Sequence, residues 1–304
     1  MSSTNFTPAW CTWLTVETIN LGCGILSLMA IRKMKSFGSS TSLLMRVLLI
    51  TDILMSTFFL FYDTYQLVQS TSNIRIAFNT FTCYCFASLQ WLLIGYSQMI
   101  TFMISLDRLF AILHPDFYKT SFSEYTKSFI IGPLIISIIS YVASFFDIFD
   151  TRSVDVCTVR RSAGKIYKYF FVGFSLSVNL ATSLSYFIMI FHVKKFGAES
   201  RSTQIQKIKS KRMKKLAKVL AFSCLCYTMT NFAQTVIMSV AVKFYPDELS
   251  PYGIYCGWLS SMDSIIIFAS FYIFMPEFKN RVDAIIINRN RIQQVTTLNV
   301  GTTY

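Results

Sequence analysis

The sequence is poor in charge, in turn residues and in histidine. Only 14% of its 304 residues are charged, whereas soluble domains carry roughly 25%. Gly (11) and Pro (6) are scarce, which excludes a collagen-like or low-complexity chain and argues against an α/β enzyme built on glycine turns. There are two histidines, His114 and His192, and no nucleophile–base–acid set is visible. We therefore predict neither an enzyme nor a metal centre.

Hydrophobic residues, in contrast, make up 53% of the chain, with 29 Phe and 16 Tyr. A spanning helix needs about 20 mostly apolar residues. Seven such stretches follow one another: Ala9–Ile31, Ser42–Leu67, Phe81–Leu106, Ser128–Phe149, Ile166–Val193, Leu216–Val242 and Tyr252–Phe274. The sequence thus predicts an all-α membrane protein, a seven-transmembrane helix bundle. The third and sixth stretches contain Gln and Asn, which favours central positions for them because polar groups at membrane depth face the interior.

The distribution of Lys and Arg predicts the orientation in the membrane. With the N-terminus outside, 21 of the 28 Lys and Arg residues fall on the cytoplasmic side. This basic face suits the anionic leaflet of a lipid bilayer, or an acidic partner, better than nucleic acid. No Lys or Arg precedes Ala9, so we expect no cleaved signal peptide. The sequon Asn5-Phe6-Thr7 then lies outside, where Asn5 can be glycosylated.

A second helix type is expected after the seventh stretch. Beyond Pro276, Lys279 and Arg281 alternate with Phe278 and Val282, a pattern typical of an amphipathic helix on a membrane surface. The chain therefore divides into an extracellular N-terminus (1–8), the bundle (9–274), an amphipathic helix on the inner leaflet (275–288) and a cytoplasmic tail (289–304). We expect a multi-pass protein of the plasma membrane.

The most specific motif ends the third stretch, where the chain reads Ser-Leu-Asp107-Arg108-Leu109-Phe-Ala-Ile-Leu-His-Pro. This resembles the Asp-Arg-Tyr signature of rhodopsin-like G-protein-coupled receptors, with Leu109 in place of the Tyr. Within that class it looks most like the SX class of nematode serpentine chemoreceptors. The alternative interpretation is an interfacial Asp–Arg pair whose charges only reach the headgroups.

The resemblance implies a switch at the inner end of the bundle. Arg108 is always charged and needs a partner or water. In the family, the neighbouring carboxylate, here Asp107, holds it at rest, and a heterotrimeric G protein receives it when the helices open. Tyr186 and Tyr272 match two inner tyrosines that stabilise the opened state, although each alone would also suit an interfacial aromatic belt. A chemosensory receptor for an extracellular small molecule or peptide is implied.

Two further features come from the same resemblance. The family places a disulfide between the outer end of the third span and the second outer loop, which implies Cys83 with Cys157; Cys85 is the alternative to Cys83. In the second span Leu48-Leu-Ile-Thr-Asp52 resembles the pattern Leu-x-x-x-Asp, which in the family lies at a sodium site. A protonated Asp52 bonded to a neighbour is the other interpretation. No other cofactor is implied.

The ligand pocket is less defined. Amine receptors carry an Asp where this chain has the neutral Gln90, so a biogenic amine is disfavoured. The seventh stretch contains no Lys, which excludes a retinal Schiff base. The remaining candidates suit a small or modestly polar ligand, although each would also serve in helix packing. They are Gln90, Trp91, Ile94, Asn231, Gln234, Trp258 and Asp263.

The chain also departs from the rhodopsin-like pattern. Met213 stands where an acidic partner of Arg108 is common, so we expect no ion pair from the sixth span to Arg108. Val178 replaces the usual Pro of the fifth span. The competing function is a small transporter or channel. Transporters show internal repeats and interrupted helices. This chain shows no repeat, and only Gly132-Pro133 interrupts a span.

Overall fold

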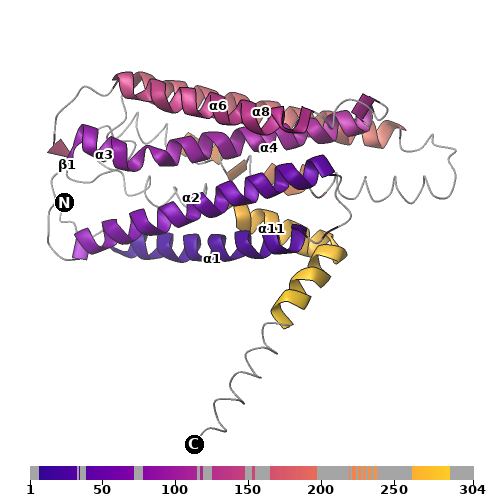
Figure 1. The fold of residues 1–304 in the computed structure, drawn as a ribbon, viewed down its shortest axis with the longest axis horizontal. Coiled ribbons are helices and arrows are strands. Elements are labelled where there is room, and N and C mark those ends of the chain that lie inside the picture. Colours follow the sequence, from indigo (N-terminus) through magenta and orange to yellow (C-terminus); the bar gives the residue numbers. More distant parts are fainter. Residues whose placement is uncertain are drawn as a thin grey trace, which may run out of the picture.

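The computed structural model describes residues 7–32, 34, 39–71, 78–114, 117–118, 125–147, 153–154, 165–196 and 262–287, with scattered helical positions between 219 and 237. Long helices lie side by side in one bundle (Figure 1). The four longest are α1 (Thr7–Arg32), α2 (Ser39–Thr71), α4 (Leu89–Leu113) and α8 (Lys165–Phe196). α1, α2 and α8 each contain a segment long and apolar enough to cross a membrane, and the stretch Phe81–Leu113, which includes α4, is another. Each of these four helices also extends past the predicted apolar stretch.

Contacts between helices define their directions. Asp52 in the middle of α2 meets Ser97 of α4, and Thr41 at the start of α2 meets Asp107 near the end of α4. These two helices are therefore antiparallel. Asn20 of α1 bonds Ser56 of α2, while Ala30 and Ile31 further along α1 pack with residues near the start of α2. Thus α1 and α4 run in the same direction.

Two later helices share that direction. Trp91 and Gln98 of α4 meet Phe171 and Ser175 of α8 in the same order, so α4 and α8 are parallel. The last apolar helix, α11 (Asp263–Phe274), packs along α1 in the same sense (Figure 1). α8 and α11 are therefore parallel to each other.

The start of the predicted third span differs from the prediction. In place of one helix from Phe81, the structure has α3 (Thr80–Ala87), a turn at Ser88, and then α4. Asn79 caps α3 by accepting a hydrogen bond of 2.6 Å from the Thr82 N–H. The two-residue strand β1 (Phe78–Asn79) pairs antiparallel with β2 (Ser153–Val154). This pairing ties the start of α3 to the segment that follows α6 (Ser128–Ala143) and the 3-10 helix η3 (Ser144–Asp147).

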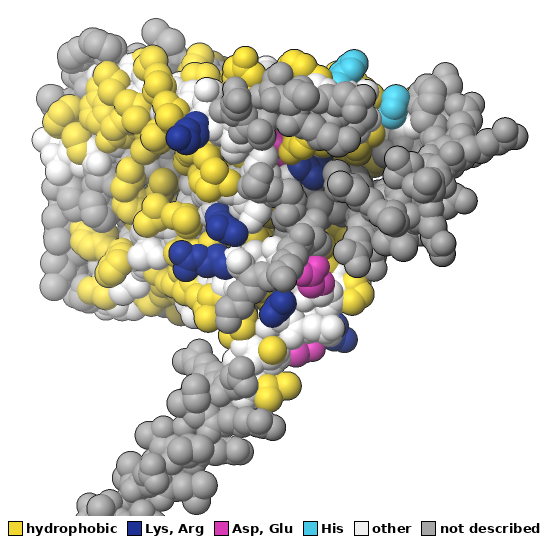
Figure 2. All heavy atoms as spheres, turned by 45° about the vertical axis from the view of Figure 1, so that its right-hand side comes forward, with side chains coloured by type: hydrophobic (Ala, Val, Ile, Leu, Met, Phe, Trp, Pro, Cys, Tyr) yellow, Lys and Arg dark blue, Asp and Glu magenta, His cyan; other side chains and the backbone are white. Residues whose placement is uncertain are grey.

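The surface of the bundle is apolar over much of its area. Figure 2 shows hydrophobic side chains across much of the visible face. On α6 the exposed large apolar side chains are Ile131, Leu134, Ile135, Ile136, Ile138, Ile139 and Val142. A soluble protein rarely exposes a contiguous apolar surface of this kind, whereas lipid tails cover it without cost.

After α11 the chain turns into a helix over residues 276–287, close to the predicted amphipathic helix. Phe278 and Val282 are buried, whereas Lys279 and Arg281 are exposed. Phe278 meets Phe271 of α11 edge to face, with ring centroids 5.5 Å apart. This helix leaves the bundle at an angle to α11 (Figure 1), with its apolar side anchored in the core.

One glycine explains how closely the helices pack in the middle of the bundle. A Cβ atom on Gly24 of α1 would lie 3.1 Å from both Ile53 Cγ1 of α2 and Ser264 Oγ of α11. The missing side chain therefore lets α1 approach both neighbours at once.

Candidate functional site

The Asp107–Arg108 pair is buried at one end of α4. Arg108 is 2% exposed and Asp107 is 0% exposed. Arg108 Nη2 lies 2.6 Å from Asp107 Oδ2, and Arg108 Nε donates to the same oxygen at 2.9 Å. A buried guanidinium has to be neutralised and hydrogen-bonded, and the adjacent carboxylate provides the charge.

Hydroxyl groups at the start of α2 complete this network. Ser40 Oγ donates to Asp107 Oδ1 at 2.8 Å, and Thr41 Oγ1 donates to Asp107 Oδ2 at 2.7 Å. Arg108 Nη2 also bonds Thr41 Oγ1, and Thr126 Oγ1 donates to Ser40 Oγ at 2.9 Å. These side chains fix the Asp–Arg pair against α2. The sequence alone does not indicate Ser40 and Thr41 as partners, because they lie 67 and 66 residues from Asp107. Ser and Thr are also common residues, so neither position stands out.

Tyr118, shortly after α4, closes the network from the other side. Its hydroxyl donates to Asp107 Oδ1 at 2.9 Å and accepts from Arg108 Nη2 at 3.1 Å. Burial raises the pKa of the Tyr118 phenol, an effect that the Arg108 charge opposes without cancelling. The phenol therefore keeps its proton and remains a donor to the carboxylate.

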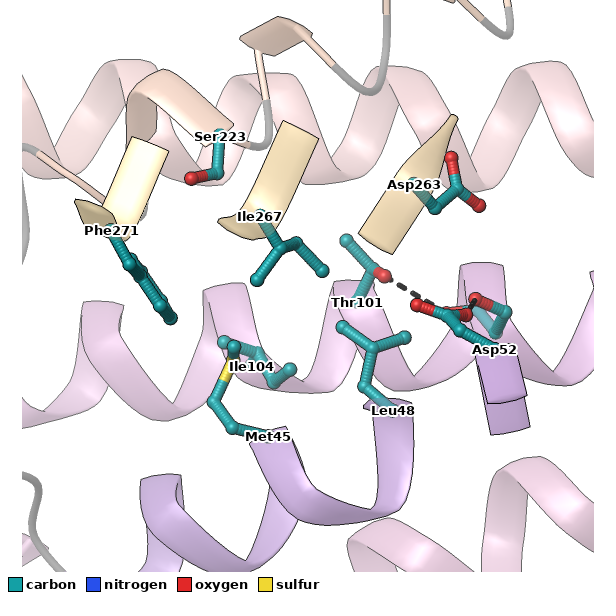
Figure 3. A pocket seen from close by; sticks show the side chains of 10 residues that line it. Met45, Leu48, Asp52, Thr101, Ile104, Ser223, Asp263, Ile267 and Phe271 are labelled. Atoms are coloured by element: carbon teal, nitrogen blue, oxygen red, sulfur yellow. Dashed lines mark hydrogen bonds between the residues drawn. The ribbon is translucent and has the colours of Figure 1, made fainter. Parts of the chain in front are cut away.

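A small cavity lies deeper in the bundle, beside Asp52. Ser97 Oγ donates to Asp52 Oδ1 at 3.0 Å, and Ser264 Oγ donates to Oδ2 at 3.4 Å. The cavity measures about 20 Å³, which is room for one water-sized particle. Figure 3 shows its lining from α2, α4 and α11, with Asp52, Thr101 and Asp263 at one end and Ile104, Ile267 and Phe271 beyond. Carboxylate and hydroxyl oxygens are ligands for a hard cation, so these residues fit the expected ion.

Further carboxyl groups lie in the same interior. Glu17 of α1 and Asp63 of α2 are 0% and 1% exposed, and Asp263 of α11 is 4% exposed. Glu17 is close enough to Asp63 and Asp263 for their charges to repel, as Asp52 is to Asp263. Within the described part of the chain neither oxygen of Asp63 has a hydrogen-bond donor. Buried carboxyl groups in a membrane protein are functional candidates by default.

Sequence analysis singled out Asp52 but not Asp63. Asp52, Ser56, Asp63 and Gln66 are separated by 4, 7 and 3 residues along α2, which places them on one helix face. All four are buried. Periodicity of the polar residues was therefore the signal that could have identified this stripe.

The predicted ligand-pocket residues divide into three groups. Gln90, Trp91 and Ile94 are half-buried on α4. The Trp91 ring meets the Phe171 ring of α8 edge to face, with ring centroids 3.9 Å apart. Asp263 lines the cavity beside Asp52. The other three, Asn231, Gln234 and Trp258, lie outside the described residues, as does the glycosylation candidate Asn5.

The cysteines and inner tyrosines are placed as follows. Cys83 is buried and disulfide-bonded, and Cys85 is an exposed free thiol. Cys157 lies outside the described residues, so its pairing with Cys83 stays a prediction. Tyr186 is buried in the core, whereas the Tyr272 hydroxyl donates to Asp283 of the 276–287 helix at 3.0 Å. Tyr272 is thus held by the 276–287 helix.

No group of three His, Cys, Asp or Glu side chains is arranged to hold a metal within the ranges described above. Together, the apolar helices and the buried Asp–Arg network define a multi-pass membrane protein with a buried ion pair at one end of its bundle. Residues 17–286 match the family of serpentine type 7TM GPCR chemoreceptors named Srsx, and the chain belongs to this family. The resemblance predicted from the third span is therefore confirmed. No curated protein matches the chain.

Proposed function

We propose that this protein is a chemosensory receptor that binds an extracellular small molecule or peptide and activates a heterotrimeric G protein. The buried Asp107–Arg108 network carries this proposal. It places a permanent cation at the end of a central helix, held by the Asp107 carboxylate, the Thr41 hydroxyl of α2 and the Tyr118 phenol. Such a network has two discrete arrangements, closed within the bundle or opened toward a partner.

The mechanism follows from the elements that hold Arg108. Its partners come from α4 itself, from α2 and from the segment after α4. A ligand that favours separation of α2 from α4 would weaken the Thr41 and Ser40 contacts together. The guanidinium would then turn toward backbone carbonyls of the G protein, for which its five donors are suited. The ligand acts only through its greater affinity for this opened arrangement.

The proposal includes seven spans with the N-terminus outside. Its support is the parallel arrangement of α8 and α11, which requires one return between them, together with helical positions at 219–237. The basic cytoplasmic loops favour the same orientation in the plasma membrane. An epitope tag after Tyr304 should be reached by antibody only in permeabilised cells, and staining of intact cells would contradict this topology.

A monovalent cation at Asp52 is also part of the proposal. Asp52, Ser97, Ser264 and Asp263 would hold it, and its charge would offset one of the two carboxylate charges. The disulfide of Cys83 with Cys157 and glycosylation of Asn5 belong to the extracellular side of the same arrangement.

The test of function is nucleotide exchange on purified G proteins, measured in membranes that contain the receptor. Panels of odorants, metabolites and peptides should include a compound that accelerates exchange over membranes without receptor. The competing function, a small transporter or channel, predicts flux of a solute across vesicles and no effect on exchange. Solute flux with unchanged nucleotide exchange would overturn the receptor proposal.

A further inference from the structure

The Tyr272 side chain is held from three sides near the end of α11. Its hydroxyl donates to Asp283 Oδ1 at 3.0 Å. The Phe268 ring stacks on it with centroids 5.7 Å apart and planes 15° apart. Lys279 Nζ lies 5.5 Å from the ring centroid, within reach of a cation–π interaction. Asp283 and Lys279 both belong to the 276–287 helix, so that helix fixes the tyrosine.

The 276–287 helix is itself fixed in the core. Phe278 is 0% exposed and meets both Phe268 and Phe271 of α11 at centroid distances of 5.8 and 5.5 Å. Val282, directly before Asp283, is 1% exposed. Asp283 is therefore fixed relative to the end of α11, and the hydrogen bond breaks only if the Tyr272 side chain turns away from it.

Arg108 occupies the closed arrangement in the same structure, with its donors bound to Asp107, Thr41 and Tyr118. The Tyr272–Asp283 bond thus accompanies a closed inner end. A phenol bound to a carboxylate is a charge-assisted donor, stronger than a bond between neutral groups. The tyrosine hydroxyl becomes available to the opened site only after this bond is lost.

We propose that Asp283 is a positioning residue that restrains Tyr272 in the resting state, and that activation requires transfer of the Tyr272 hydroxyl away from it. The inference rests on the proposed function, because it assigns the restraint to the same switch. It also explains what holds the tyrosine of the seventh span at rest: the acceptor stands on the following helix. Asp283 acts through Tyr272 and need not touch the G protein.

The experiment compares Asp283→Ala, Tyr272→Phe and the double variant at equal surface density. Asp283→Ala should raise ligand-independent nucleotide exchange about three- to tenfold, which is the effect expected from one lost hydrogen bond on a two-state equilibrium. Asp283→Asn keeps an acceptor oxygen and should give a smaller rise. The exposed Asn280, on the same helix, supplies the control Asn280→Ala, which should leave exchange unchanged.

The double variant separates a restraint on Tyr272 from a general loosening of the helix. Without the phenol there is nothing for Asp283 to hold, so Asp283→Ala should have no effect in the Tyr272→Phe background. An equal rise in both backgrounds would overturn the proposal. So would unchanged exchange in Asp283→Ala when Asp107→Asn in the same assay does respond.

A second readout needs no G protein. Hydrogen–deuterium exchange of the amides of residues 276–287, measured in lipid nanodiscs, should accelerate in Asp283→Ala and in Tyr272→Phe to a similar extent. Protection equal to that of the wild type in both variants would overturn the restraint. If protection changes but no variant of the receptor, Asp107→Asn included, promotes nucleotide exchange, the proposed function fails while the Tyr272–Asp283 restraint stands.

Discussion

The two polar regions of the bundle differ in how their charges are balanced. Near the end of α4, Arg108 and Asp107 neutralise each other, and hydroxyl groups of Ser40, Thr41 and Tyr118 surround them. In the middle, Asp52 and Asp63 lie on one face of α2 beside further carboxyl groups of α1 and α11. Among the described residues, the only ion pair is the one between Arg108 and Asp107.

This difference indicates two roles. A network in which each charge has its partner stabilises one arrangement, and opening it exchanges those bonds for others. A group of buried carboxyls with no cation among the described side chains depends on what binds it, a proton or a small cation. The Asp107–Arg108 network thus stabilises one arrangement of the helices, whereas the carboxyl groups in the middle depend on binding of a proton or a small cation. Substitutions in the two regions should therefore have effects of different size and sign.

The largest effect is expected at Arg108. Arg108→Ala should keep surface expression and ligand binding but reduce ligand-stimulated nucleotide exchange about 10- to 150-fold, equivalent to one charge-assisted hydrogen bond of about 1.5–3 kcal/mol. Arg108→Lys should recover little, since a compact ammonium cannot reproduce the planar fork. Lys127→Ala, an exposed cation outside the network, is the control. Full exchange in Arg108→Ala would remove the basis of the proposed mechanism.

A smaller effect is expected when a partner of Arg108 is substituted. Asp107→Asn removes the charge that holds the guanidinium and should raise ligand-independent exchange about 5- to 30-fold, for about 1–2 kcal/mol of lost restraint. Thr41→Val keeps the shape but removes one neutral hydrogen bond, so a rise of about fivefold follows. The measurement is basal exchange at matched receptor density. Unchanged basal activity in both variants would mean that α2 does not restrain Arg108.

The smallest effect is expected when Asp is replaced by Asn in each of the two regions and the stabilities of the two variants are compared. Asp63→Asn removes a buried carboxyl that has no donor in the described structure, and should raise the thermal midpoint of the receptor in detergent by a few degrees. Asp107→Asn should lower the midpoint, because it leaves the Arg108 cation unpaired. Each kcal/mol corresponds to roughly 2–4 °C. Shifts of the same sign in both variants would contradict the distinction between the regions.

Most helices could be predicted from hydropathy alone, because lipid requires long apolar segments whose backbone groups bond internally. The predicted stretches Ala9–Ile31 and Ile166–Val193 correspond to α1 (Thr7–Arg32) and α8 (Lys165–Phe196). The helices run further at both ends because polar residues in the interface continue the hydrogen-bond ladder. The turn at Ser88 was not predictable, since Thr80–Ala87 and the residues after it are equally apolar.

The site was predictable where sequence neighbours are also spatial neighbours. Asp107 and Arg108 are adjacent in the chain, so the motif already contains the contact. Ser40, Thr41 and Asp283 take their roles from tertiary packing, which no local pattern reveals. The close approach of α1 at Gly24 is of the same kind, because the reason for the glycine is a pair of atoms on α2 and α11.

The polar face of α2 has a consequence for biogenesis. On insertion scales an Asp at the centre of a lone membrane helix costs about 2.5–3.5 kcal/mol, and α2 carries Asp52 and Asp63. α1 precedes it and offers Asn20, whose amide donates to Ser56 at 2.8 Å, and Gly24, which permits close contact. The two helices are therefore best suited to leave the translocon together as an antiparallel hairpin, with Ser56 and Asp63 of α2 already turned toward α1 and away from the lipid.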